Sequence, residues 1–362
     1  MALYCASDDD REIIESVTMV ALKGELERRI GALRSRIAHN QSGHSGRFIL
    51  FTHDPHGLGG QISRRLLAIR VGLMTARTAV FPDEDFFPYE NVFEPLTEAT
   101  FAISKSVPPI DLMCLEGDSR PVVYFDFWAC WENKAFRELV YSALPIEVDG
   151  IPDGAILLDG IIFSSFRLKA SYYSRIAPYL AQIKAMGSVI GVHFRRGDKY
   201  VETPYVDSAV YRRHIEAVAA RHNIKDVFIS SDSPNAMREL ALDETLFNIH
   251  FDVNERRYNN ANHKFLIAHR ELAPQETFSA IKNIYMLSCC TQIVGQTNAH
   301  FASLAAGRLY ATRMDPDFGV LIDPMLAPKN WSMRLLNSIY RYSRSVGKRI
   351  LPLYFLKSKQ RE

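Results

Sequence analysis

The feature that most constrains this chain is an apolar segment that ends in two adjacent arginines. Residues 189–194 read Val-Ile-Gly-Val-His-Phe, and Arg195-Arg196-Gly197-Asp198 follow directly. The apolar run predicts a buried strand, at whose end an arginine is costly unless its guanidinium meets an anion. Two arginines beside a glycine, which lets backbone approach closely, predict a site for a doubly charged group such as a diphosphate. We therefore expect a nucleotide-diphosphate site at the carboxyl end of a central strand, with Asp198 orienting one guanidinium.

The composition is that of an ordinary folded protein. Hydrophobic residues make up 47% and charged residues 23% of the 362 residues, which argues against a disordered chain or a coiled coil. The length predicts two domains, because a single core stops growing well below this size. A formal net charge of +2 argues against a nucleic-acid-binding protein, which usually carries a strongly basic domain.

The five cysteines indicate neither a disulfide framework nor a zinc site. Their number is odd, Cys289 and Cys290 are neighbours, and no CxxC or Cys/His ligand spacing occurs. Residues 1–10 lack the basic and apolar regions of a secretory leader. No uninterrupted apolar stretch reaches the roughly 18 residues that span a bilayer. We therefore expect a cytoplasmic protein in a reducing compartment.

The first half of the chain predicts a helix followed by an α/β unit. Residues 12–38 form an amphipathic helical pattern, in which Gly24 and Gly31 are weak points. A strand at 47–52, a glycine-rich turn at 57–61, a helix from Ile62 to about Ala76 and a strand at 78–81 open a βαβ unit. Beyond it we expect a strand at 121–127, a helix at 132–144, turns at 145–160 and a helix at 167–186 that breaks or kinks at Pro178.

The second half predicts a regular alternation of strands and helices with short connections. This order is typical of a parallel, doubly wound sheet, and the fold class is therefore α/β. The expected strands are 189–194, 226–232, 247–251 and 292–296, and the expected helices are 208–221, one from about 234, 277–289 and 299–307.

Polar residues collect where these four strands end. In open α/β sheets ligands bind beyond the carboxyl ends of the strands, so the shared position predicts one ligand site. The last stretch also opens a helix, whose free N–H groups favour phosphate oxygens. The four stretches are 193–198, Ser231-Asp232-Ser233-Pro234, the polar residues after Phe251, and Gln296-Thr297-Asn298.

Each of these residues also has a purely structural interpretation. The two arginines would form a surface ion pair with Asp198, and His193 would be a satisfied core residue rather than part of the chemistry. Asp232 would be a helix cap or a turn residue before Pro234, and Asn298 only a helix cap. The turn Gly57-Leu58-Gly59-Gly60-Gln61 resembles a phosphate-cradling loop, but such turns are common without a ligand.

Several stretches resemble one known family. His193-Phe194-Arg195-Arg196-Gly197-Asp198 is similar to the His-x-Arg-Arg-x-Asp motif of the fucosyltransferase superfamily, which includes the α1,2-, α1,6- and protein O-fucosyltransferases. The stretches 57–61, 90–98 and 227–234 are similar to segments of the α1,6 branch, and residues 284–299 correspond more loosely to its last helix–strand unit. The similarity covers roughly residues 47–308 in collinear order.

The resemblance implies a GT-B-like fold, in which two Rossmann-type domains face a cleft. To these the chain adds an N-terminal helix and a basic C-terminal tail. The expected activity is an inverting, metal-independent transfer of fucose from GDP-fucose to a hydroxyl of a glycan or glycolipid. The expected parts are an N-terminal helical segment at 1–46, an acceptor-side α/β domain at 47–186, a nucleotide-sugar-binding domain at 187–328 and the tail at 329–362.

The resemblance also implies roles for single residues. Arg196, with Arg195 or His193 assisting, would stabilise the charge that grows on the leaving diphosphate. No predicted strand of the second half ends in the Asp-x-Asp that would hold a divalent ion, and Asp315-Pro316-Asp317 is typical of a turn. The expected contacts to the guanosine or its diphosphate come from Gly57, Gly59, Gly60, Gln61, Asp198, Asp232, Asn283, Asn298 and His300.

The chain departs from the family pattern at the expected base and nucleotide contacts. Lys199 matches a family lysine, but the glutamate four residues beyond it is replaced by Thr203, and Glu202 is displaced by one position. Glu202 is our candidate base for the acceptor hydroxyl, and its alternative is an exposed loop residue. Asn283 stands where the family has an aspartate, and Ala299-His300 replace a Ser-Gln pair. A different donor sugar or base therefore stays open.

The C-terminal tail is basic, aromatic and amphipathic. Residues 334–361 contain eight arginines and lysines, interleaved with apolar and aromatic residues, and no acidic residue. Such a segment is attracted to anionic headgroups by about 1 kcal/mol per near-surface cation. One hypothesis is peripheral docking on the inner membrane leaflet, where a lipid-linked oligosaccharide acceptor would lie. The alternative is a solvated helix packed on the first domain.

Two classes of function follow from the sequence. The first is a glycosyltransferase that uses a nucleotide sugar, as the resemblance implies. The second is a non-catalytic nucleotide-sugar or glycan-binding protein that kept the scaffold and lost the base, which the changes at Thr203 and Asn283 permit.

Overall fold

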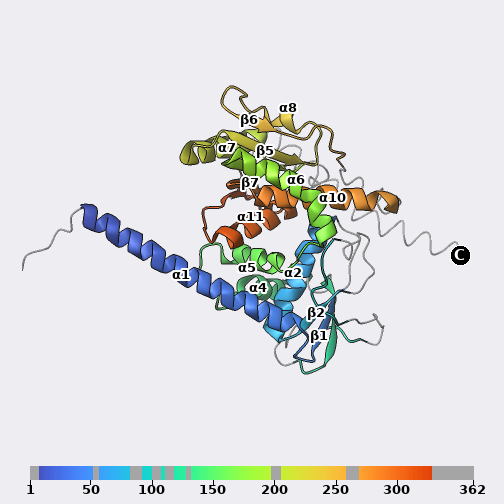
Figure 1. The fold of residues 1–362 in the computed structure, drawn as a ribbon. Coiled ribbons are helices and arrows are strands. Elements are labelled where there is room, and N and C mark those ends of the chain that lie inside the picture. Colours follow the sequence, from blue (N-terminus) through green and yellow to red (C-terminus); the bar gives the residue numbers. More distant parts are fainter. Residues whose placement is uncertain are drawn as a thin grey trace, which may run out of the picture.

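A computed structural model of the protein describes residues 8–51, 57–81, 92–99, 107–110, 118–127, 132–196, 205–257 and 269–327. Two parallel β-sheets lie at opposite ends of the molecule, and helices fill the space between them (Figure 1). The architecture is therefore α/β with parallel sheets. Among the described residues, no helix combines the length and the apolar run that a membrane crossing needs.

The larger sheet has five parallel strands in the order β6-β5-β4-β7-β8. The order reverses between β4 and β7, and such a switch point is where open α/β sheets bind ligands. All six residues of the central strand β4 are buried, because helices cover both faces of a parallel sheet. The strands are β4 (Val189–Phe194), β5 (Asp226–Ser231), β6 (Asn248–His250), β7 (Gln292–Gln296) and β8 (Gly319–Ile322).

Two apolar clusters cover the two faces of this sheet. Ile190, Val192 and Phe194 of β4 pack with residues of α7 (Ser208–His222) and α8 (Ala236–Leu240). The opposite face belongs to a cluster that includes residues of α10 (Ala273–Ser288) and α11 (His300–Arg313). A short 3-10 turn, η3 (Arg270–Leu272), precedes α10. Alternate residues of β4 therefore face different helices, as the twofold period of a strand requires.

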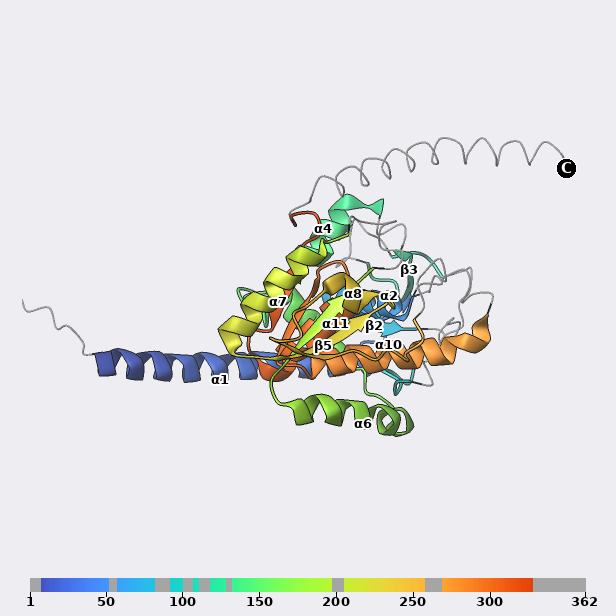
Figure 2. The same ribbon diagram turned by 90° about the horizontal axis from the view of Figure 1, so that it is seen from above.

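The smaller sheet has three parallel strands in the order β2-β1-β3. Its strands are β1 (Phe48–Phe51), β2 (Thr78–Val80) and β3 (Val122–Phe125). The helices that precede the larger sheet in the sequence are α1 (Asp8–Gln41), α2 (Leu58–Thr75), α4 (Lys134–Ser142), α5 (Gly154–Ser164) and α6 (Ala170–Met186), of which α6 packs against α10. The N-terminal part of α1 extends away from the body of the molecule (Figures 1 and 2).

The helices α5 and α11 join the two halves at a close crossing. A Cβ atom built on Gly160 of α5 would lie 1.8 Å from the carbonyl oxygen of Gly307 on α11, so the two backbones touch. One continuous cluster of buried apolar residues includes Ile49 of β1, Ile162 of α5 and Ile293 of β7. The core therefore runs across the boundary expected near residue 186, and the division into domains stays a prediction.

Several expectations from the sequence need correction. The helix α2 begins at Leu58 rather than Ile62, so Gly59 and Gly60 lie in its first turn and not in a loop. Residues 145–160 were expected to form turns, yet α5 occupies Gly154–Ser164, because burial of its apolar residues outweighs the low helix propensity of glycine. The strand β8 was not predicted. The helix α6 is continuous through Pro178, so the helix does not break there, and α1 continues through both of its glycines.

Candidate functional site

A pocket of about 170 Å³ lies at the carboxyl ends of β4 and β5. His193 and Arg195 line it from the central strand, and Ser230, Ser231 and Asp232 line it from the neighbouring strand. The first turn of α2 and the start of α11 complete this side of the wall. Residues from both halves of the chain thus meet at the switch point of the larger sheet.

The two adjacent arginines have opposite surroundings. His193 and Arg195 are odd-numbered and line the pocket, whereas Arg196 is not among the lining residues. Arg196 instead lies on the side of α7 and α8, with its guanidinium carbon 3.8 Å from the centroid of the Phe194 ring. Because side chains alternate along an extended backbone, the face of β4 decides which arginine can meet a ligand.

Asp232 holds Arg195 at the pocket. Its Oδ2 atom forms an ion pair with Nη1 of Arg195, and its Oδ1 atom accepts a hydrogen bond of 2.8 Å from the backbone N–H of Arg196. The side chain of Arg195 is 21% exposed, so part of it stays accessible in the pocket. Asp232 thus orients this guanidinium, whereas Asp198, of which we had expected that role, lies outside the described residues. It caps no helix, since the N-cap of α8 is Asn235.

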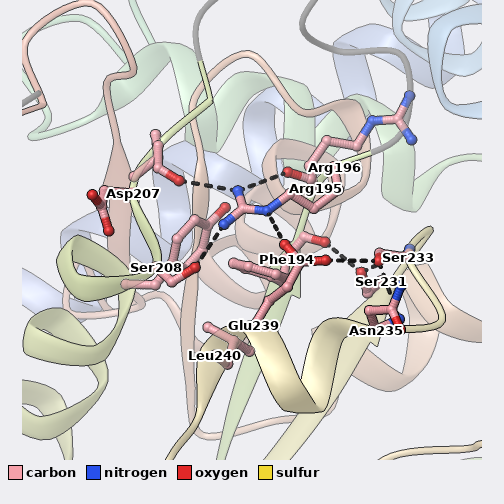
Figure 3. Close-up of polar contacts among 12 residues, drawn as sticks. Phe194, Arg195, Arg196, Asp207, Ser208, Ser231, Ser233, Asn235, Glu239 and Leu240 are labelled. Carbon is pink, nitrogen blue, oxygen red and sulfur yellow. Dashed lines mark hydrogen bonds and ion pairs between the residues drawn. The ribbon is translucent and has the colours of Figure 1, made fainter. Parts of the chain in front are cut away.

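The guanidinium of Arg196 is held by neighbouring protein groups. Its Nε donates to Glu239 Oε2 at 2.8 Å, one terminal nitrogen donates to the carbonyl of Val206 at 3.0 Å, and the other donates to Ser208 Oγ at 2.9 Å. Figure 3 shows this guanidinium enclosed by Ser208, Glu239 and the backbone of Arg195. The residue is only 9% exposed. Arg195 lines the pocket and Arg196 does not, so the contact of either arginine with a diphosphate stays a prediction.

The N-termini of two helices line the pocket. Gly57, the N-cap of α2, and Leu58, Gly59 and Gly60 in its first turn are lining residues. The N-cap of α11 is Ala299, and no side chain caps either helix. Uncapped N-termini carry partial positive charge and bind anions. Together with Arg195 they make this end of the pocket suited to phosphate oxygens.

Contacts of aromatic rings and of a glycine fix the starts of α2 and α11 relative to the larger sheet. The His193 ring stacks on Phe301 with 5.5 Å between centroids, and a Cβ atom on Gly59 would lie 2.8 Å from the Phe301 ring. Glycine at position 59 therefore allows α2 to approach α11 closely. It belongs to a helix and not to a phosphate-binding loop. His193 is both a buried, packed residue and a pocket-lining one, and a part for it in the chemistry stays a prediction.

The rest of the pocket lining carries acidic and basic side chains and the amide of Asn283. Asn283 of α10 donates to both oxygens of the Glu255 carboxylate at 3.0 and 3.1 Å. Nζ of Lys282 lies 2.9 Å from Glu255 Oε1. Glu255, Glu276 and Asn283 all line the pocket. Lys282 balances the charge of Glu255. Glu276 is the acidic lining residue whose pKa is shifted by its surroundings.

Burial, together with the nearby carboxylates of Glu255 and Asp232, raises the pKa of Glu276 to about 8, while Arg195 opposes the shift. At neutral pH the Glu276 side chain is therefore mainly the uncharged acid, which can donate a hydrogen bond. Three carboxyl groups line the pocket, those of Asp232, Glu255 and Glu276. Because Glu276 is uncharged at neutral pH, the lining repels an anion less than three carboxylates would.

The remaining predicted site residues fall into two groups. Gln61 is fully buried and, like Asn298, is not among the lining residues, whereas His300 and Asn283 are. Gly197, Asp198, Lys199 and Glu202 lie outside the described residues. The proposed base is therefore not placed.

Sequence reasoning missed part of the site. It pointed to the polar stretch after Phe251, which supplies Glu255, Arg256 and Arg257 to the lining, but not to these residues singly. It gave no sign of Glu276, whose only sequence signal is an acidic residue in the first turn of a helix. Such residues are common on solvent-facing helices, so the pattern alone does not select it.

Comparison with known proteins gives distant likenesses only. No family model matches the chain, and no curated protein matches it. The structure of the NodZ alpha-1,6-fucosyltransferase soaked with GDP-fucose aligns with a TM-score of 0.40 at 16% identity, over 73% of this chain and 92% of that chain. POFUT1 in complex with GDP-fucose aligns with 0.44 at 12% identity, over 76% and 98%.

A third likeness is to an Arabidopsis thaliana FUT1 mutant in complex with GDP, with a TM-score of 0.44 at 12% identity, over 73% of this chain and 68% of that chain. At these scores and identities the likenesses assign neither an activity nor a role to any residue. The function has to be argued from the pocket itself.

Proposed function

We propose that the pocket binds the diphosphate of a nucleotide sugar and that the protein is a glycosyltransferase of the fucosyltransferase type, with GDP-fucose as donor. The observation that carries the proposal is Arg195, held by Asp232 at the carboxyl end of β4 and flanked by the N-termini of α2 and α11. A guanidinium and two helix N-termini provide the charge-assisted donors that a diphosphate needs. The motif His193 to Asp198, in which this arginine stands, supports the choice of donor.

The same groups account for the chemistry. In an inverting transfer the acceptor hydroxyl forms a bond to the sugar C1 on the face opposite the diphosphate, and the bond from C1 to the β-phosphate oxygen breaks. Negative charge then grows on that phosphate, where Arg195 and the helix N–H groups stabilise it. No divalent ion enters this proposal. The hydroxyl proton passes to a base, for which Glu202, beside Lys199, remains our candidate.

The experiment is a donor assay on the purified protein. We expect slow release of GDP from GDP-fucose, faster with a suitable glycan or glycolipid acceptor, and undiminished by EDTA. UDP- and CDP-sugars should release less nucleotide. Arg195→Ala should abolish release, whereas Arg213→Ala, which removes an equal charge from an exposed position on α7, should not. Release from no nucleotide sugar would contradict an enzymatic role.

A second function is supported by one feature of the pocket. Asn283, where the resemblance leads us to expect an aspartate, is engaged with Glu255, and Thr203 replaces the expected base. A protein that binds a nucleotide sugar or glycan without transferring it would tolerate both changes. Tight GDP binding without hydrolysis or transfer to any acceptor tested would favour this function.

Docking of residues 334–361 on an anionic membrane is a separate proposal, which rests on their charge pattern because they lie outside the described residues. It would place a cytoplasmic enzyme on the inner leaflet beside lipid-linked acceptors. Flotation with anionic liposomes should decrease when these residues are removed. Equal flotation of the truncated and full-length proteins would exclude this role.

A further inference from the structure

One carboxylate outside the Arg195 pocket bonds to both of the segments that continue from β4 and β5. Oε2 of Glu239, on α8, accepts a hydrogen bond of 2.8 Å from Nε of Arg196, and Oε1 accepts one of 3.0 Å from Oγ of Ser233. Arg196 lies just beyond β4 and Ser233 just beyond β5 (Figure 3). Glu239 is not among the residues that line the pocket, so its influence on a ligand must pass through other side chains.

The turn that Glu239 holds contains Asp232. The Ser231 hydroxyl donates to the backbone carbonyl of Phe194 at 2.6 Å, which ties the end of β5 to the end of β4. The oxygen of the same hydroxyl accepts from the backbone N–H of Ser233 at 3.0 Å. Asp232 lies between these two serines, so its backbone is restrained on both sides.

This restraint decides where the Asp232 carboxylate lies. One of its oxygens accepts from the backbone N–H of Arg196 at 2.8 Å, and the other forms the ion pair with Arg195. An unrestrained arginine has many rotamers, and a ligand that must order one loses affinity through the lost entropy. A guanidinium that is already held in the pocket therefore binds an anion more tightly.

The two oxygens of a carboxylate suit this bridge, because each accepts a bond from a different partner. Alanine at position 239 would remove both bonds. Glutamine could keep both, since its amide oxygen can accept from Arg196 and its amide nitrogen can donate to the Ser233 hydroxyl oxygen. The two substitutions therefore separate the bridge from the charge.

We propose that Glu239 is a positioning residue of the pocket. By bonding to Arg196 and Ser233 at once, it holds Asp232 in the place from which that carboxylate orients Arg195. The consequence for donor binding rests on the proposed function, whereas the order of the Arg195 side chain does not.

The first measurement needs no ligand. NMR relaxation of the arginine Nε–H groups in the full-length protein reports how firmly Arg195 is held, with its signal assigned through Arg195→Lys. Glu239→Ala should lower the order parameter of this group to below about 0.6, the range of flexible groups, and Glu239→Gln should keep the wild-type value. Glu216→Ala removes an equal charge from an exposed position on α7 and should change nothing.

Ser233→Ala is the second variant, in case Glu239→Ala does not fold. It breaks the bond between Ser233 and Glu239 and leaves the bond between Glu239 and Arg196 in place. Arg195 should become more mobile in this variant too. Equal order of Arg195 in the wild type and in Ser233→Ala, or in a folded Glu239→Ala, would overturn the proposal whether or not GDP binds.

Titration of GDP then connects the order of Arg195 to the donor. The affinity should fall about five-fold with Glu239→Ala, the effect of losing one hydrogen bond. In the Arg195→Ala background the same change should cause no further loss, because it acts through Arg195. A further loss of equal size would show a general structural role and overturn the proposal. If Glu239→Ala loosens Arg195 but the wild type binds no GDP, the positioning role is supported and the proposed function is contradicted.

Discussion

At the scale of single residues, the site depends on the alternation of side chains at the end of β4. Arg195 faces the pocket and is held by Asp232, whereas Arg196 faces α7 and α8 and is held by Glu239 and Ser208. The two arginine side chains therefore have different surroundings because they lie on opposite faces of the extended backbone. One remains accessible to an anion, and the other ties the strand end to two helices.

Arg196→Ala should therefore reduce stability more than ligand binding. The change removes the donor shared by Glu239, Ser208 and the Val206 carbonyl. We expect a loss of about 2 kcal/mol in the free energy of unfolding. The loss is limited because the Glu239 side chain stays in contact with water. Urea unfolding of this variant beside Arg195→Ala measures the difference. Equal stability of the two variants would contradict the assignment.

Glu276 should make ligand binding depend on pH. Its pKa of about 8 lies above the usual 4.5, mainly through burial, so the acid is neutral at pH 7 and becomes a carboxylate above pH 8. Its contribution to stability is fully present below pH 4.5 and disappears as the pH rises through 8. The new charge should also weaken GDP binding about tenfold between pH 7 and 9.5.

The control for this prediction is Glu276→Gln, which cannot ionise. GDP phosphates are ionised throughout this range, since the second pKa of a phosphate ester is about 6. Calorimetric titration of GDP should give a flat profile for the glutamine variant. A decline as steep as that of the wild type would assign the pH dependence to another group.

At the scale of elements, the crossing of α5 and α11 is the contact that holds the pocket together. Gly160 and Gly307 let the two backbones touch, and the start of α11 carries His300 and Phe301 into the pocket wall. The position of the start of α11 in the pocket wall therefore depends on a crossing with Gly160, which is far from it in sequence.

Gly160→Ala should separate the two helices. A Cβ atom there would lie 1.8 Å from the Gly307 carbonyl oxygen, so we expect a loss of about 3 kcal/mol or more in the free energy of unfolding. Gly24→Ala is the matched control, because it is exposed in α1 with nothing within 4 Å of the new atom. It should stabilise the protein by up to about 1 kcal/mol. Thermal unfolding compares the two, and equal effects would contradict the close crossing.

Most elements were predictable from the chain, and the failures have physical reasons. Strands such as 189–194 follow from apolar runs bounded by polar residues, and the edge of the sheet that binds ligands follows from their order. The helix α5 did not follow, because glycines that serve a tertiary crossing look like turn residues in isolation. Which arginine lines the pocket depends on the register of β4, which the sequence does not give. The place of Glu276 in the pocket depends on a contact between segments that are distant in the sequence.

At the scale of the whole molecule, the two sheets share one buried core. The cluster that contains Ile49 and Ile293 reaches from the smaller sheet to the larger one. We expect one calorimetric unfolding transition for the protein, and GDP should raise the temperature of that whole transition. Two separated transitions, of which GDP moves only one, would instead support independent domains with a boundary near residue 186.

We propose that Arg195, oriented by Asp232, binds the phosphates of a nucleoside diphosphate. Isothermal titration of GDP into the wild type, Arg195→Ala and the exposed control Arg213→Ala tests this proposal. GDP affinity should fall about 10- to 100-fold with Arg195→Ala, as expected for the loss of a charge-assisted hydrogen bond, and should stay unchanged with Arg213→Ala. Equal affinity of the wild type and Arg195→Ala, or no GDP binding at all, would contradict the proposal.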